Sequence, residues 1–487
     1  MKKYFIYIFT IFLCLNTFAQ DYSFSKSIKL NAKTPRFKIL GKNLNYIVAE
    51  RWGAKYHYID LYNAKLKKVA TKDISPEKNE HIKKIWIQPK KGWIIYTKAN
   101  KEYTLLQAKQ MDARFNSRST PLLLDSIVER KDLVQENLRM KYSFNEKYLA
   151  TYMPIFSKGE IDYFSINVFN KELKKTQKLR LREKFIKNGK YVKLLILNDG
   201  SIVVVYREQD ETNKFKVFYK KVGKDLKTYD LNISNEVFKK IKVEVDNRTK
   251  ELIIAGFRTS ENNKNAANAF FTLKLDLETG TKTEKVIEVF TEDFYKLLTG
   301  KMPKTEEVSL QTFYINKIIP KTDGGYLVFA ESFFVNTETK SIPSIARHSG
   351  TQIAPSFEEN TYKVKIINYN DIVVYNITDS LQLESVNIIS KRQKSTDDNG
   401  GYSSFFIFNQ LDKLNILFLD EINTNSSLKN YTIFRDIEID KDYIFNVSQN
   451  NIMPVLKMSV QTAPKEILIP SFLNNSFSII KIVFDEI

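Results

Sequence analysis

The segment that decides the fold is Gly200–Tyr206 (GSIVVVY), a short run of β-branched residues that follows Asn198-Asp199 directly. Asn-Asp-Gly between two apolar runs is typical of a tight hairpin turn. An alternating segment, Phe215–Lys220 (FKVFYK), comes next in the chain. Because the aliphatic content of the first segment is almost continuous, both of its faces are expected to be buried between neighbouring sheets.

Seven more segments of the same kind recur along the chain: Asn45–Glu50 (NYIVAE), Gly92–Thr97 (GWIIYT), Lys147–Tyr152 (KYLATY), Glu251–Phe257 (ELIIAGF), Gly325–Ser332 (GYLVFAES), Leu414–Glu421 (LNILFLDE) and Glu466–Phe472 (EILIPSF). Successive copies begin 47 to 55 residues apart, except for two gaps of 74 and 89 residues that hold insertions. One strand precedes each copy, and turn-linked strands follow it. The repeat predicts an all-β fold, an eight-bladed β-propeller of four-stranded antiparallel blades, with seven blades as the alternative.

The two ends of the chain predict how the ring closes. The last copy supplies strands up to Phe484 but has no outer strand, whereas Tyr22–Leu30 (YSFSKSIKL) is a lone alternating strand ahead of the first complete blade. If that strand is donated to the last blade, both exposed strand edges are paired. We therefore expect residues 21–487 to form one domain.

Residues 1–20 have the three-part pattern of a secretory signal. Met1-Lys2-Lys3 is basic, Tyr4–Leu15 is apolar, and small residues stand at Thr17 and Ala19 before the expected cleavage point. The apolar run is too short for a transmembrane helix, and no later stretch of the chain approaches the required length. The sequence predicts export, followed by a periplasmic, outer-membrane-associated or secreted location.

Composition narrows the classes of partner and chemistry. The formal net charge is +20, but the basic residues are spread along the chain and mixed with Asp and Glu, which argues against nucleic acid. The basic excess is interpreted first as a solvated surface, with an envelope protein or an acidic glycan as a possible partner. With only 3 His, and with the only Cys inside the signal, neither a metal site nor a cofactor is expected.

Two segments resemble an uncharacterised family of exported Bacteroidota propeller-like proteins: Ile315–Ser332 and Asn370–Leu419. In that family, an Asp-Gly-Gly-Tyr strand is followed by an Ile-x-Lys-x-Gln strand and a Gly-Tyr-x-Ser-Tyr-like entry. The matching residues here are Lys391, Gln393, Gly401, Tyr402 and Ser404, with Phe405 in place of the usual Tyr. The resemblance implies export and a propeller fold, but it brings no activity and no catalytic residue.

Topology predicts where a ligand would bind. In a four-stranded meander, the turns between second and third strands and the crossings between blades lie at the same end of the ring. The long insertions Arg258–Asn268 and Phe333–Asn370 belong to this end and are expected to be loops, which is where function usually resides. Charged strand termini lie there too. The hypothesis is that they line one pocket, with Trp52 as a stacking surface: Arg51, Trp52, Arg207, Glu208, Arg258, Glu331 and Asp420.

The sequence favours an exported binding or scaffold module over an enzyme. The alternative is a carboxylate-dependent enzyme acting on envelope or extracellular polysaccharide, because paired carboxylates are recognised only in space. The carboxylates considered all end apolar strands: Glu50, Glu208, Glu331, Asp420 and Glu421. A third interpretation is a structural partner of an outer-membrane assembly.

Overall fold

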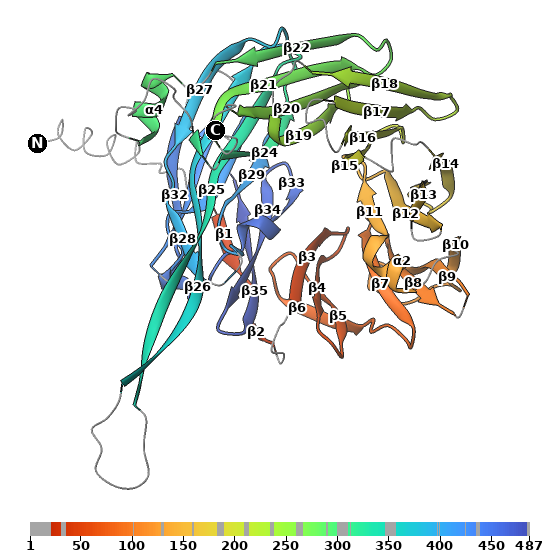
Figure 1. Cartoon of the computed structure of the whole chain (residues 1–487). Helices are drawn as coiled ribbons and strands as arrows, with labels where there is room; N and C mark the ends of the chain where they lie inside the picture. Colours follow the sequence, from red (N-terminus) through yellow and green to blue (C-terminus); the bar gives the residue numbers. More distant parts are fainter. Residues whose placement is uncertain are drawn as a thin grey trace, which may run out of the picture.

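The computed structural model contains eight antiparallel sheets of at least four strands each, arranged around a common centre (Figure 1). It describes residues 21–30, 36–100, 102–127, 131–157, 160–182, 189–208, 214–233, 238–259, 266–288, 291–299, 310–311, 313–345, 357–396, 398, 400–423, 425–434 and 439–484. The predicted signal, residues 1–20, lies outside this set. The fold is the predicted eight-bladed propeller, and the seven-bladed alternative is wrong.

The first four blades follow one another in sequence order. Blade 1 consists of β3 (Arg36–Lys42), β4 (Ile47–Trp52), β5 (His57–Tyr62) and β6 (Lys68–Asp73). Blade 2 consists of β7 (Glu80–Ile87), β8 (Lys91–Ala99), β9 (Thr104–Asp112) and β10 (Leu122–Ile127). Blade 3 consists of β11 (Arg139–Tyr142), β12 (Tyr148–Ser157), β13 (Glu160–Asn170) and β14 (Lys175–Leu181). Blade 4 consists of β15 (Gly189–Ile196), β16 (Ile202–Glu208), β17 (Lys214–Lys220) and β18 (Leu226–Asn232).

The remaining blades continue in the same way. Blade 5 consists of β19 (Phe238–Asp246), β20 (Glu251–Thr259), β21 (Ala266–Asp276) and β22 (Lys282–Ile287). Blade 6 consists of β24 (Phe313–Pro320), β25 (Tyr326–Ile345), β26 (Phe357–Ile377) and β27 (Leu383–Ile389). Blade 7 consists of β29 (Phe405–Asn409), β30 (Leu414–Leu419), β31 (Ser427–Ile433) and β32 (Ile439–Asn446). Blade 8 consists of β33 (Val460–Ala463), β34 (Glu466–Leu473), β35 (Ser476–Val483) and β1 (Asp21–Phe24).

Short additional elements occupy the connections between blades. They are α2 (Lys131–Asn137), α4 (Glu292–Thr299), α5 (Val447–Asn450), the 3₁₀ turn η1 (Leu456–Met458), and the strands β2 (Ile28–Lys29), β23 (Leu310–Gln311) and β28 (Gln393–Thr396). Strand β23 pairs with β21, and β28 pairs with β26, so two crossings between blades add an edge strand to the blade they leave.

The predicted pairing of the N-terminal strand with the last blade is confirmed. Strand β1 pairs with β35 from Asp21↔Val483 to Phe24↔Ile480, and β2 pairs further along the same strand. The N-terminal strand is therefore the outer strand of the last blade, and residues from the two ends of the chain share one sheet.

Burial between blades explains the continuous apolar runs. In β16, Val203 and Val205 pack toward blade 5, whereas Ile202 and Val204 pack toward blade 3. All four side chains are essentially inaccessible to water. Because a propeller blade lies between two others, both faces of its second strand must be apolar.

One insertion differs from its prediction. The segment Phe333–Asn370 was expected to be a loop, but β25 and β26 continue through it and pair from Phe333↔Tyr369 to Ile345↔Phe357. The segment is rich in β-branched residues, which favour strands over coil. The result is a two-stranded ribbon that extends well beyond the ring (Figure 1).

Candidate functional site

The central channel of the ring is lined by the first strand of each blade. Contacts join β3 to β7, β11 to β15, β15 to β19, and β19 to β24, so these innermost strands follow one another around the centre. Among five consecutive innermost strands, β7, β15, β19 and β24 each carry a lysine directly after a shift in strand register, and β11 carries Lys141 two residues closer to its hairpin turn. We call this set the lysine arc: Lys84, Lys141, Lys193, Lys242 and Lys317.

A repeated β-bulge positions four of these five lysines. The register shifts immediately before Lys84, Lys193, Lys242 and Lys317, where each innermost strand pairs with the second strand of its own blade. An extra residue in one strand bends that strand and redirects the side chain that follows. The bulge therefore gives the same orientation to lysines of different blades.

Three lysines of the arc reach the innermost strand of the next blade. Lys141 Nζ donates to the Leu194 carbonyl at 2.9 Å, and Lys193 Nζ donates to the Val243 carbonyl. The Lys84 ammonium lies 4.8 Å from the centroid of the Tyr142 ring. An innermost strand has one edge without a strand partner. Lys141 and Lys193 therefore donate to backbone carbonyls on that edge.

Burial and neighbouring positive charge lower the pKa values of lysines in the arc. Burial, followed by the charge of Lys193, lowers the pKa of Lys141 to about 8. Burial and the charges of Lys193 and Lys317 also lower the pKa of Lys242. Burial lowers the pKa of Lys317, although this side chain remains accessible to water, which is expected for a group on a concave wall. Mutual repulsion at such a site favours a bound anion.

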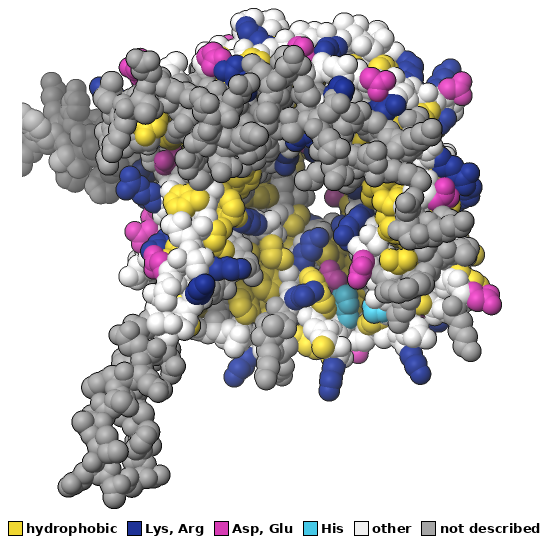
Figure 2. All heavy atoms as spheres, viewed as in Figure 1, with side chains coloured by type: hydrophobic (Ala, Val, Ile, Leu, Met, Phe, Trp, Pro, Cys, Tyr) yellow, Lys and Arg dark blue, Asp and Glu magenta, His cyan; other side chains and the backbone are white. Residues whose placement is uncertain are grey.

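Acidic residues offset only part of this charge. Glu244 Oε2 lies 3.1 Å from Lys193 Nζ, and its carboxylate also favours the charged forms of Lys141, Lys242 and Lys317. The strands β29 (FFIFN) and β33 (VQTA), on the remaining part of the ring, contain no charged residue. The channel is therefore basic along one arc and uncharged along another. Figure 2 shows a central hollow with Lys and Arg side chains standing along its wall.

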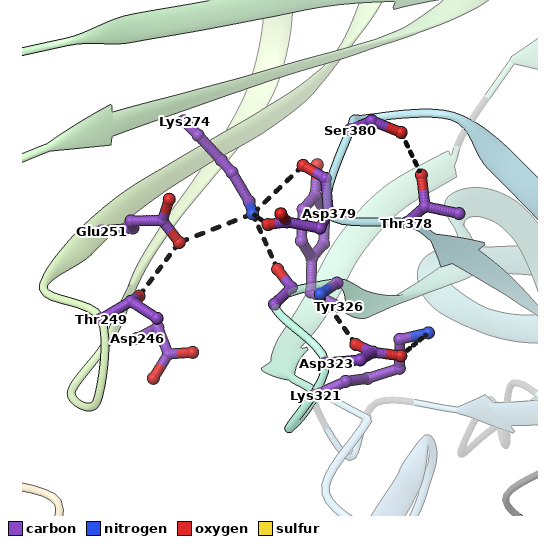
Figure 3. Close-up of polar contacts among 12 residues, drawn as sticks. Asp246, Thr249, Glu251, Lys274, Lys321, Asp323, Tyr326, Thr378, Asp379 and Ser380 are labelled. Atoms are coloured by element: carbon purple, nitrogen blue, oxygen red, sulfur yellow. Dashed lines mark hydrogen bonds and ion pairs between the residues drawn. The ribbon is translucent and has the colours of Figure 1, made fainter.

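Lys274 of β21 shows how a lysine is neutralised in this fold. Its Nζ lies 2.5 Å from Asp379 Oδ1 and 3.5 Å from Glu251 Oε2, and it donates to the Gly324 carbonyl at 2.7 Å (Figure 3). Two carboxylates and a carbonyl thus hold one cation between the turns of blades 5 and 6. In the lysine arc, one glutamate, Glu244, serves several lysines, so positive charge remains.

Each described residue of the predicted pocket already contacts another side chain of the protein. Arg51 forms a two-point ion pair with the fully buried Asp60, and Trp52 stacks on His57 with ring centroids 5.9 Å apart. His57 Nε2 in turn lies 2.6 Å from Glu50 Oε1. These contacts keep Arg51 and Trp52 within blade 1.

The other pocket residues lie on four further blades. Arg207 lies over the Phe215 ring of its own blade, and Arg258 Nη2 lies 2.7 Å from Glu288 Oε1. Asp420 accepts from the Ser427 amide and lies 3.7 Å from Lys429. The Glu208 side chain falls outside the described part of the structure. A common pocket formed by these residues stays a prediction.

Glu331 belongs to a closed polar network instead of an open surface. Its side chain is 0% exposed, as is that of Lys391, and Lys391 Nζ lies 2.8 Å from Glu331 Oε1. The hydroxyl groups of Tyr314 and Ser404 each donate to Glu331 Oε2 at 2.6 Å. Every oxygen of this carboxylate has a donor, so Glu331 joins blade 6 to the entry of blade 7 and is not accessible to a ligand.

The residues that carry the family resemblance form the rest of this network. Gln393 Oε1 accepts from Lys391 Nζ at 3.1 Å and from the Ser404 amide at 2.6 Å, while its Nε2 donates to the Leu419 carbonyl at 2.6 Å. Tyr402 donates to the Phe472 carbonyl of blade 8 at 3.1 Å. The motif residues hold three blades together, which is a structural role.

The lysine arc was missed from the sequence, although a signal for it is present. Four of the five lysines open the last apolar stretch before a hairpin turn: Lys84-Ile85-Trp86, Lys193-Leu194-Leu195, Lys242-Val243 and Lys317-Ile318-Ile319. Counting basic residues along the chain made them look scattered. Aligning the first strands of the blades would have shown them in register.

The described residues lack two features. Those residues contain no group of three or more His, Cys, Asp or Glu side chains placed to hold a metal ion. Within the same part of the chain, none of the helices has the length and apolar character needed to cross a bilayer.

No family of proteins and no curated protein matches the sequence. Among solved structures, the chain is similar to the β-propeller domain of Nup133 from Vanderwaltozyma polyspora, with a TM-score of 0.41, 13% identity, and coverage of 92% of this chain and 100% of that one. It is also similar to prolyl oligopeptidase B from Galerina marginata, with a TM-score of 0.40, 6% identity, and coverage of 92% of this chain. The chain spans about half the length of the prolyl peptidases that it matches, 55% in each of two cases. The fold assignment itself rests on the eight sheets and their strand order.

Proposed function

We propose that the protein is a binding module whose central channel takes an acidic polymer, an acidic glycan in particular. The observation that carries this proposal is the lysine arc, in which five consecutive innermost strands each carry a lysine, four of them at the same register position. Carboxylate or sulfate groups repeated along a polymer would each meet a lysine and relieve the repulsion between Lys141, Lys193 and Lys242. The uncharged strands β29 and β33 would face the rest of the polymer.

The place of action follows from the N-terminal pattern. A basic start, an apolar run and small residues before Gln20 support export, and an exported propeller would meet glycans of the envelope or of the medium. We propose a periplasmic, outer-membrane-associated or secreted module of the Bacteroidota type that the motif residues resemble.

A binding role accounts for the described carboxylates better than the alternative of a polysaccharide-cleaving enzyme. Glu50 lies 2.6 Å from His57, Glu331 is sealed against Lys391, and Asp420 holds a turn amide next to Lys429. A glycoside hydrolase of the common type instead places two carboxyl groups on either side of one open subsite.

Removal of two ammonium groups from the arc is expected to weaken polymer binding at least tenfold. The double variant Lys141→Ala, Lys193→Ala deletes adjacent charges of the channel wall, whereas Lys141→Arg, Lys193→Arg keeps them. The measurement is calorimetric binding of polygalacturonate and of dextran sulfate, with uncharged dextran as the ligand control. Binding of the charged polymers should also weaken steeply with added salt.

A matched control removes the same net charge elsewhere. Lys227 and Lys282 lie on the outermost strands β18 and β22, so Lys227→Ala, Lys282→Ala should leave the affinity within twofold. If this control loses as much affinity as the arc variant, binding depends on net charge alone and the channel is not the site.

Polymer binding is expected to weaken as pH rises from 7 to 9. The pKa of Lys141 is lowered to about 8, so its ammonium is lost through this range, and a bound anion would raise that pKa again. Binding at pH 8 should therefore take up protons, which calorimetry in buffers of different ionisation enthalpy measures directly. In Lys141→Arg, which stays charged, both the pH dependence and the proton uptake should be reduced.

A further inference from the structure

A cavity of ≈ 170 Å³ lies between blades 2 and 3, away from the central channel. Blade 3 provides one wall from β12, β13 and β14, and blade 2 provides the other from β9 and β10, with Leu138 after α2. By the volume of liquid water, about 30 Å³ per molecule, it has room for about five waters. A space of this size also suits one small organic molecule.

The cavity exists because two large side chains are missing from an interface between blades. In blade 5, the third strand β21 packs Phe271 and Leu273 against the preceding blade. The equivalent register positions of β13 hold Ser165 and Asn167, opposite Met153 and Thr151. Small polar residues therefore replace apolar packing in the middle of an otherwise buried face.

Asn167 presents an unused acceptor to this space. The residue is 2% exposed, and its Nδ2 donates to Asp125 Oδ2 at 3.0 Å, while its Oδ1 has no hydrogen-bond partner among the described residues. A buried amide oxygen without a donor costs free energy, and natural interiors rarely leave one. The Asp125 carboxylate also lines the cavity and lies 3.5 Å from Lys175 Nζ, so this wall gathers acceptors that can bind an ammonium group.

The same wall carries cations at its outer rim. Lys178 pairs in register with Asn167, and Arg180 pairs with Ser165, so each lies one strand further out than the acceptor side. Arg180 is fixed over the Tyr163 ring, 5.3 Å from its centroid. A purely cationic ligand would be repelled here, whereas a ligand with a carboxylate near its ammonium group would be held at both ends.

Beside the hydroxyl groups of Ser126, Thr151 and Tyr163, the lining includes aliphatic and thioether side chains: Leu106, Ile127, Leu138, Met153 and Ile155. Burial of an apolar side chain in this part of the cavity contributes about 25 cal/mol per Å² of apolar surface removed from water. The cavity thus offers acceptors, cations and an apolar wall within the space of one small molecule.

We propose that this cavity binds a free α-amino acid with an aliphatic or thioether side chain. The ammonium group would lie against Asn167 Oδ1 and Asp125, the carboxylate would face Lys178 and Arg180, and the side chain would fill the apolar wall. The proposal is independent of the channel, because none of the residues of the lysine arc lines this cavity.

The test is calorimetric titration of the whole mature chain with leucine, isoleucine and methionine, each up to millimolar concentration. We expect saturable binding of at least one of them and at least tenfold weaker binding of three analogues. These are N-acetyl-leucine, which lacks the ammonium group, isopentylamine, which lacks the carboxylate, and alanine, which lacks the apolar side chain. Thermal stabilisation by the same ligands gives a second measurement.

Two variants locate the site, and one serves as the matched control. Asn167→Leu keeps the volume but removes the acceptor, and Arg180→Ala removes the rim cation; each should weaken binding at least tenfold. Arg182→Ala removes an equal charge from a residue that also stacks on Tyr163, at 5.1 Å, but does not line the cavity. Its affinity should stay within twofold of the parent chain.

If Asn167→Leu does not fold, a variant that fills the cavity still tests the proposal. Ser165→Leu should raise the melting temperature, because it restores apolar packing, and should abolish amino acid binding. If none of the amino acids binds, the cavity holds water only and the proposal is overturned. Equal binding of N-acetyl-leucine and leucine, or equal loss in Arg180→Ala and Arg182→Ala, would overturn it as well.

Discussion

Deletion of residues 21–30 is expected to destabilise the chain that begins at Asp21 by several kcal/mol, a large part of a typical net stability of about 5–15 kcal/mol. The deleted strand covers the outer edge of β35 and adds ring contacts to blade 7. Tyr22 and Phe24 lie 5.3 Å and 5.7 Å from Phe445, centroid to centroid, and Leu30 is 4% exposed. Without them, blade 8 has an open edge beside a bare apolar surface.

The measurement is the melting temperature of a chain that begins at residue 31, compared with one that begins at Asp21. A synthetic peptide of residues 21–30, added in excess, should restore part of the lost stability by mass action. A scrambled peptide of the same composition is the control. Equal melting temperatures for the two chains would show that β1 does not close the ring in solution.

The second large effect concerns the buried ion pair between Glu331 and Lys391. Lys391→Met removes the cation that pairs with the Glu331 carboxylate, which has no access to water, and should cost about 3–5 kcal/mol. Burial also lowers the pKa of Lys391, so part of the pairing energy already offsets the cost of placing its charge there. Glu331→Gln alone should be destabilising too, because it leaves the buried ammonium without its counter-ion.

The double variant Glu331→Gln, Lys391→Met distinguishes the interaction between the two charged groups from the interactions that each group makes with its surroundings. It removes both charges while Tyr314 and Ser404 retain an acceptor, and so should be clearly more stable than Lys391→Met alone. Urea unfolding of the four chains gives the coupling energy. If the effects of the two single changes simply add, the two groups do not form the coupled pair described above.

The fold was predictable because its main signal is local. A strand such as Gly200–Tyr206 carries apolar residues on both faces, and its copies recur at a nearly constant spacing in the sequence. The unpaired N-terminal strand was also visible, because the last repeat lacks a strand. The ribbon of β25 and β26 was not predicted, since Phe333–Asn370 contains no apolar run and stays paired far from the ring.

The polar sites were not predictable in the same way. Glu331 and Lys391 lie 60 residues apart, and their contact exists only once the entry to blade 7 packs on blade 6. The orientation of Lys193 depends on a β-bulge, and no residue type in the sequence indicates that bulge. The cavity beside Asn167 requires knowledge of what the neighbouring blade leaves empty. Each of these features depends on how two neighbouring blades pack together. The repeat pattern in the sequence describes only the strands within one blade.

The pairing of β1 with β35 also has a kinetic consequence. Ser25 bonds to Ile479 across 454 residues of sequence, so this contact cannot form until nearly the whole chain has been synthesised and released. Closing so long a loop costs entropy that grows only slowly with length, but contacts of this separation form late and slowly. Until then blades 1 to 7 stand as an open arc with two apolar ends, a state in which a second chain can donate its own N-terminal strand. The interval between release of the last strand and closure is therefore the period in which this protein is most exposed to strand exchange and aggregation.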